Sequence, residues 1–184
     1  MSLMKKITTS IFTILFAGLT FFFTAAASFA QERGNQEART SPNAAVSQTI
    51  GTTEVSITYG RPSANDREVF GGLEAFGEVW RTGANEATAI TFSDNVMIEG
   101  EQLEAGTYSL YTIPGKDEWT IIINSQQSWG TQYDESQDVL RVTTTPEESH
   151  HVEQFMIYFE KVTNSSAECV LHWKNTKVPF TINV

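Results

Sequence analysis

The chain has 184 residues with 12 basic and 22 acidic side chains, which gives a formal net charge of −10. Such an acidic protein repels phosphate backbones and anionic lipid, so we expect neither nucleic acid nor a membrane surface as a partner. Cys169 is the only cysteine, and its alternation with Leu171 and Trp173 places it on a buried strand face as an inert thiol.

Residues 1–30 are predicted to be a secretory signal peptide. Lys5 and Lys6 precede an apolar run over residues 7–23, and small residues follow up to Ala30. This order predicts cleavage after Ala30 and a periplasmic or extracellular location, with no membrane attachment after cleavage. The alternative is an uncleaved anchor, because the run is barely long enough to span a bilayer. Loss of the two lysines would change the net charge from −10 to −12.

The rest of the chain has the size of one domain. Residues 31–41 are polar and lack periodicity, so they are predicted to form a flexible leader. Residues 42–184 are predicted to form a single domain.

This domain is predicted to be an all-β, antiparallel, jelly-roll-like sandwich of about nine strands, because short runs with a two-residue apolar period recur between turn signals. Trp119–Ile123 is apolar on both faces and is expected to be a central strand. The runs occupy residues 55–59, 90–92, 96–98, 107–113, 119–123, 139–145, 152–162, 168–174 and 178–184.

Two stretches interrupt the strand pattern. Leu73–Trp80 lacks a two-residue period and is predicted to contain one short helical insertion. Residues 125–137 form a second long loop. Long loops on a rigid β scaffold are the usual location of binding residues.

Arginine is concentrated in the residues on either side of the first stretch. Arg61, Arg67 and Arg81 lie within one glycine-rich and aromatic segment of an otherwise acidic chain. Arginine is suited to planar, bidentate recognition of carboxylate or phosphate and to stacking on aromatic rings. A ligand pocket and a set of loop-holding arginines are both consistent with this pattern.

In the pocket interpretation, Arg81 and Asn85 orient an anionic or polyhydroxyl ligand and Glu86 accepts hydrogen bonds from it. Trp80 or Tyr59 then supplies a stacking wall. In the alternative, the arginines hold loops against the sandwich, for example through an Arg81–Glu86 ion pair.

Trp129 and Tyr133 lie among polar residues of the 125–137 loop and are further candidates for ligand contact. They can stack on a sugar ring or cover an open end of the sandwich. His150 and His151 are neighbours on a strand and point to opposite faces, so they do not chelate one metal ion together. His172 is expected to be exposed. We predict no metal and no cofactor.

A longer set of motifs comprises Tyr59-Gly60-Arg61-Pro62, Phe70-Gly71-Gly72, Val79-Trp80-Arg81-Thr82-Gly83-Ala84-Asn85-Glu86-Ala87-Thr88, residues 103–115 and residues 119–124. This set resembles the family catalogued as domain of unknown function 2911. The resemblance covers the chain from Ser41 onward and implies an exported bacterial protein, but no catalytic residue.

The sequence thus favours a non-catalytic binding module for a small polar, anionic or carbohydrate ligand. One alternative is a hydrolase or lyase that uses Glu86 or Asp66 beside Arg81. Another is a structural or protein-interaction domain of the cell envelope, for which an exposed apolar patch would be the sign.

Overall fold

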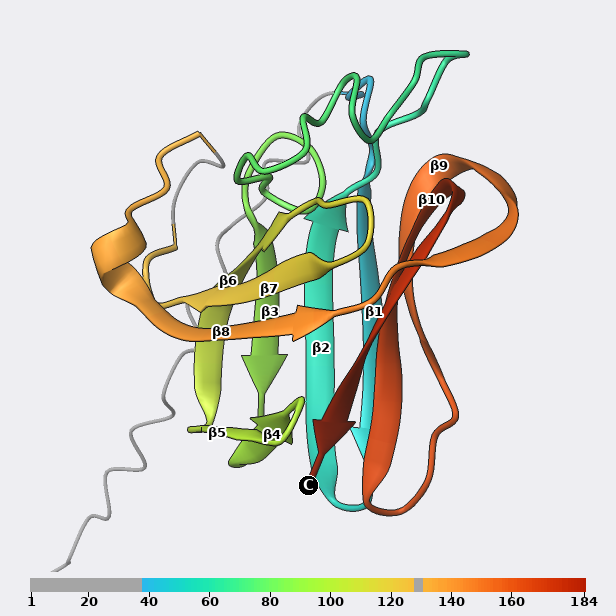
Figure 1. Ribbon diagram of the computed structural model, residues 1–184. Coiled ribbons are helices and arrows are strands. Elements are labelled where there is room, and N and C mark those ends of the chain that lie inside the picture. Colours follow the sequence, from blue (N-terminus) through green and yellow to red (C-terminus); the bar gives the residue numbers. More distant parts are fainter. Residues whose placement is uncertain (1–37, 128–130) are drawn as a thin grey trace, which may run out of the picture.

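The computed structural model describes residues 38–127 and 131–184. Two antiparallel sheets pack as a sandwich, which confirms the predicted fold class (Figure 1). The larger sheet has the order β1 (Asn43–Ile50), β2 (Thr53–Gly60), β3 (Thr88–Phe92), β6 (Gly106–Ile113), β7 (Trp119–Asn124) and β8 (Asp138–Thr144). The smaller has the order β5 (Glu101–Leu103), β4 (Val96–Ile98), β10 (Ser166–Asn183) and β9 (Glu147–Glu160).

The described residues form ten strands, and each departure from the predicted set of strands has a local cause. β1 was missed because Gln48 interrupts its apolar alternation, yet the whole strand pairs with β2 from Asn43 opposite Gly60 to Ile50 opposite Thr53. β5 has only three residues.

The two runs predicted at the C-terminus form one long strand, β10. Register shifts on either side of Lys174 bend it, so that its first part pairs with β9 as far as Lys177. Its last residues pair with β4 from Ile182 onward. Pro179 lies between these two paired stretches, where its missing N–H is tolerated.

The helical insertion expected within Leu73–Trp80 is not formed. This stretch makes turns, in which the Gly71 N–H donates to the Glu74 carbonyl at 2.8 Å and the Gly77 N–H donates to the Pro114 carbonyl at 2.9 Å. One bond within the turn and one bond to the turn between β6 and β7 thus replace bonds along a helix. The helical turn among the described residues is η1 (Glu135–Gln137), in the other long loop.

Aromatic rings fill the space between the sheets. Trp119 and Trp173 are 1% and 0% exposed, which confirms their predicted core positions. Cys169 is buried on the same face of β10 as Leu171 and Trp173, as predicted.

The predicted exposure of His172 was wrong, since it is 1% exposed. Its Nε2 lies 3.0 Å from the carbonyl of His150 in β9, the strand that pairs with β10, and its ring packs on the His150 ring.

Candidate functional site

The segment between β2 and β3, residues 61–87, is an insertion that crosses one end of the sandwich (Figure 1). We call it the insertion. It is tied to both sheets: the Ala64 N–H donates to the Glu153 carbonyl of β9 at 2.9 Å. At its other end, Trp80 and Thr112 of β6 exchange two backbone hydrogen bonds of 2.7 and 2.9 Å. The sheets therefore fix the positions of its side chains.

Arg61 and Arg67 bind backbone carbonyls of the protein itself. Arg61 Nε donates to the Phe155 carbonyl at 2.9 Å. Arg67 donates from Nε to Ala64 at 2.9 Å and from Nη2 to Ser63 at 2.8 Å. For these two arginines the structure supports the loop-holding interpretation.

Tyr59 and Trp80 are core residues, each 4% exposed. The Tyr59 hydroxyl accepts a hydrogen bond from the Ile157 N–H at 3.0 Å. Trp80 Nε1 donates to the Gly83 carbonyl at 3.1 Å, and the Trp80 ring stacks on Trp173 with centroids 5.8 Å apart. Neither ring is therefore available as the surface wall of a pocket.

Asn85 and Glu86 hold the chain that precedes β1. Asn85 Nδ2 donates to the Ser41 carbonyl at 3.1 Å. Arg39, which lies in the stretch predicted to be a flexible leader, donates to both Glu86 oxygens at 2.7 and 3.0 Å. The Arg81–Glu86 pair considered from the sequence is thus replaced by Arg39–Glu86. The Glu86 carboxylate is buried and accepts two hydrogen bonds from Arg39, so it is poorly placed to act as a general base.

Arg81 differs from the other arginines of the insertion. Its backbone is fixed, because the Thr88 N–H donates to the Arg81 carbonyl at 3.2 Å and Trp80 is bound to β6. Its side chain is partly exposed, and among the described residues its buried Nε has no hydrogen-bond partner. An unsatisfied buried donor costs free energy, more so when it is charged. The backbone of Arg81 is therefore fixed, while its side-chain Nε lacks a hydrogen-bond partner within the described part of the chain.

Glu74 was not found by sequence reasoning, yet it interacts with Arg81. Burial raises the pKa of the Glu74 carboxyl to about 7, while the charges of Arg81 and Arg67 act in the opposite direction. The effect of burial on the pKa of Glu74 is thus larger than that of the two nearby cations. No sequence signal marks Glu74, since it sits in an ordinary-looking loop between Leu73 and Ala75.

Tyr133 lies against the larger sheet, with its ring centroid 4.9 Å from that of Tyr111 in β6. Its hydroxyl donates to Asp138 at 2.6 Å and accepts from Arg141 at 2.6 Å. Burial, followed by the hydrogen bond to Asp138, raises the pKa of Tyr133 to about 12. The hydroxyl is thus engaged within the protein. Trp129 lies outside the described residues.

The comparisons with known proteins identify the family. A family model described as protein of unknown function (DUF2911) matches residues 41–182. The chain belongs to the DUF2911 family. No curated protein and no solved structure matches it significantly.

In this DUF2911 protein, the residues described include no group of three or more His, Cys, Asp or Glu side chains placed to hold a metal ion. No helix within 38–127 and 131–184 is both long and apolar enough to cross a membrane.

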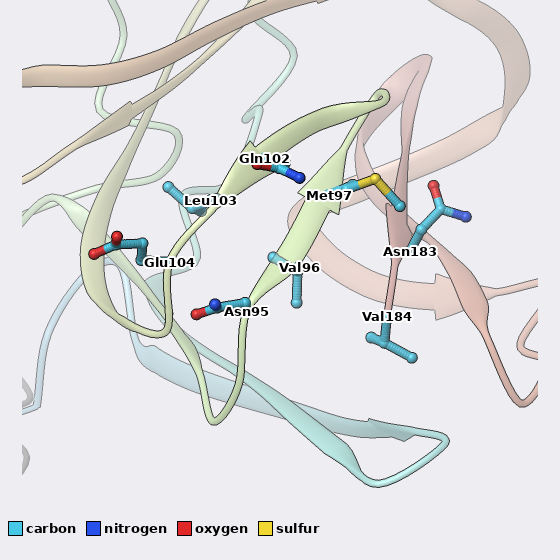
Figure 2. A pocket seen from close by; sticks show the side chains of 8 residues that line it. All are labelled: Asn95, Val96, Met97, Gln102, Leu103, Glu104, Asn183 and Val184. Carbon is cyan, nitrogen blue, oxygen red and sulfur yellow. The ribbon is translucent and has the colours of Figure 1, made fainter.

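A hollow of about 510 Å³ lies beside the β4–β5 hairpin and the end of β10 (Figure 2). The amides of Gln102 and Asn183 and the Met97 thioether lie close together at its edge. None of the three arginines of the insertion belongs to its described lining. The hollow is therefore separate from the arginine-bearing site of the DUF2911 protein.

The raised pKa of Glu74 predicts how the stability of this DUF2911 protein depends on pH. The pKa is higher in the folded state, about 7, than the ordinary 4.5, so stability falls as the pH rises from about 4.5 through 7. Glu74→Gln removes this cost of ionisation. We expect it to increase the free energy of unfolding by about 1–2 kcal/mol near pH 8, after allowance for solvent screening of a partly exposed group, and to change it little near pH 4.

Urea denaturation at the two pH values measures the effect. Glu78→Gln, at an exposed position of the same loop, is the matched control and should show no such gain. An equal gain from Glu74→Gln at both pH values would contradict the assignment.

Proposed function

We propose that this DUF2911 protein is an exported, non-catalytic binding module for a small anionic or polar ligand, with Arg81 as its main anion-binding group. The observation that carries the proposal is the Arg81 guanidinium, held by a fixed backbone and without a partner for its buried Nε among the described residues. Export is inferred from residues 1–30 of the sequence.

The chemistry of Arg81 defines the ligand class. A planar guanidinium pairs best with a carboxylate or a phosphate, through two parallel hydrogen bonds. The protein is otherwise strongly acidic, so a fixed local cation is needed to hold an anion. The other arginines of the insertion already donate to carbonyls, which leaves Arg81 for this role.

Thermal shift and calorimetric titrations of the exported form with inorganic phosphate, citrate and neutral hexoses test the proposal. We expect phosphate or citrate to raise the melting temperature and Arg81→Gln to abolish the effect. Lys161→Gln makes the same change in charge at an exposed lysine paired with Glu168 and should leave the effect intact. Equal shifts in both variants, or no shift with any of these ligands in the wild type, would contradict the proposal.

One observation favours a second function, a hydrolase or lyase. The pKa of Glu74 lies near 7 beside Arg81, which suits a general acid or base better than the ion-paired Glu86 does. Recovery of a bound ligand chemically unchanged after long incubation supports the binding module. Conversion of the ligand by the wild type, lost in Glu74→Gln, would support the enzyme.

A further inference from the structure

The insertion exposes an apolar surface that the anion-binding proposal does not use. Leu73, Phe76 and Val79 are 42%, 39% and 37% exposed, and they fall within seven consecutive residues. Single exposed apolar side chains are ordinary, whereas three in one short loop are a candidate interaction surface. We call these three residues the insertion patch.

A hollow of about 360 Å³ adjoins the patch at Phe76. Its apolar wall includes Phe70 and Trp119 of the core, and its rim combines the β6–β7 turn, the start of β9 and a bend of β10. The lining consists of Phe70, Phe76, Gly115, Lys116, Trp119, Pro146, Glu147, Glu148, Asn175 and Thr176. A hollow of this size beside exposed apolar groups can receive one large apolar side chain as an anchor.

The patch is fixed before any partner arrives. The Glu74 N–H donates to the Val69 carbonyl at 2.8 Å and the Gly77 N–H to the Pro114 carbonyl at 2.9 Å. A Cβ on Gly71 would lie 2.5 Å from the Phe76 ring, so the ring packs directly on the Gly71 backbone, and Lys116 Nζ lies 5.9 Å from its centroid. A preformed surface loses little conformational entropy on binding.

Charge around the patch specifies the partner. Glu78 lies within the patch sequence, Asp117 and Glu118 follow Lys116, and Glu148 lines the hollow; all four are exposed. Lys116 is exposed, Lys177 is paired with Glu147 and Glu160, and Arg67 and Arg81 lie near Glu74 of the same loop. Carboxylates still outnumber cations around the patch. An apolar surface with a predominantly acidic rim is complementary to an apolar anchor flanked by basic residues.

We propose that the insertion patch and its adjoining hollow bind a basic segment of a partner protein, which inserts one bulky apolar side chain beside Phe76. Electrostatic attraction to the acidic rim accelerates the encounter, and burial of the anchor slows dissociation. The ligand of this surface has the opposite charge to that of the Arg81 anion site, so the two binding reactions can be measured separately.

Fluorescence anisotropy with short synthetic peptides tests the proposal on the exported form. We expect a lysine-rich peptide with a single central tryptophan to bind, and its affinity to fall with added salt. The same peptide with the tryptophan replaced by alanine, or with the lysines replaced by glutamate, should bind much more weakly.

Variants of the protein locate the contact. Phe76→Ser should weaken binding of the tryptophan peptide by about tenfold or more. Met97→Ser is the matched control, because Met97 is also 39% exposed but lies on β4, and it should bind like the wild type. Val79→Ser, with circular dichroism as a check of folding, repeats the test should Phe76→Ser unfold.

Three results would overturn the proposal. The first is that folded Phe76→Ser and Met97→Ser proteins bind the tryptophan peptide equally well. The others are that the glutamate peptide binds, or that the lysine peptide does not. Concentration-dependent self-association lost in Phe76→Ser would instead assign the patch to a second copy of the chain. A response to neutral glycans alone would assign the hollow to sugar. The anion titrations of Arg81→Gln test the Arg81 site separately, whichever of these results is obtained.

Discussion

Replacement of Trp80 by alanine is expected to lower the free energy of unfolding by about 3–5 kcal/mol. The Trp80 ring is 4% exposed, and its centroid lies 5.1 Å from Phe155, 5.8 Å from Phe70 and 5.8 Å from Trp173. Its removal leaves a cavity between the sheets and loses four aromatic contacts, including the one with Trp119. Urea denaturation followed by far-ultraviolet circular dichroism measures the loss without relying on tryptophan fluorescence.

Trp80→Phe is the control, because it keeps an aromatic ring in the cluster and loses only the Nε1 hydrogen bond to Gly83 and part of the volume. We expect a cost well below that of alanine. A near-normal stability of Trp80→Ala, together with loss of ligand binding, would show that Trp80 is a surface wall rather than part of the core.

Replacement of Gly60 by alanine is expected to cost about 3 kcal/mol. A Cβ on Gly60 would lie 2.3 Å from the Ala84 carbonyl oxygen and 3.0 Å from its carbon. The neighbour is backbone, so relief requires the end of β2 and the returning arm of the insertion to move apart. Because the Arg81 site lies in that arm, we expect anion binding to weaken together with stability.

Gly100→Ala separates the clash from the backbone cost of replacing glycine. Gly100 has a φ of +87° and open space where its Cβ would lie, so its cost is conformational only, about 1 kcal/mol. Thermal unfolding of both variants gives the comparison. A Gly60→Ala variant no less stable than Gly100→Ala would mean that β2 and the insertion are not in close contact.

The strand pattern could be predicted from the sequence wherever one face is buried. Trp119–Asn124 pairs on both sides and its central residues are buried, so a continuous apolar run was a sufficient signal. The length of β10 could not be predicted, because Pro179 and the polar stretch near Lys174 resemble a break. Register shifts let one strand serve two partners there, and such shifts depend on tertiary pairing.

The sequence predicted which segment holds the unusual polar side chains, but not which groups those side chains bind. Arg39 and Glu86 are 47 residues apart, and nothing local distinguishes Arg39 from Arg81 as the partner of Glu86. Tyr59 and Trp80 have a polar atom on an apolar body, so they suit a pocket wall and a core equally well. Only the packing decides between these roles.

The string of residues 80–88 that carries the family resemblance is mainly structural in this protein. Thr82 is 0% exposed, its hydroxyl lies 3.1 Å from that of Thr112, and the Thr88 hydroxyl donates to the Thr82 carbonyl at 2.6 Å. Asn85 takes a φ of +66° and binds the Ser41 carbonyl. These contacts build a rigid arm, in which Arg81 Nε has no hydrogen-bond partner among the described residues.

Proton–nitrogen correlation spectra of the arginine Nε–H groups test the role of Arg81 most directly. The Arg81 resonance is assigned by its loss in Arg81→Lys, and inorganic phosphate or citrate is then titrated into the wild type. We predict a saturable shift of the Arg81 Nε–H signal that exceeds the shifts of the carbonyl-bound Arg61 and Arg67. An Arg81 signal that stays unchanged while the anion binds elsewhere, or while it fails to bind at all, would contradict the account.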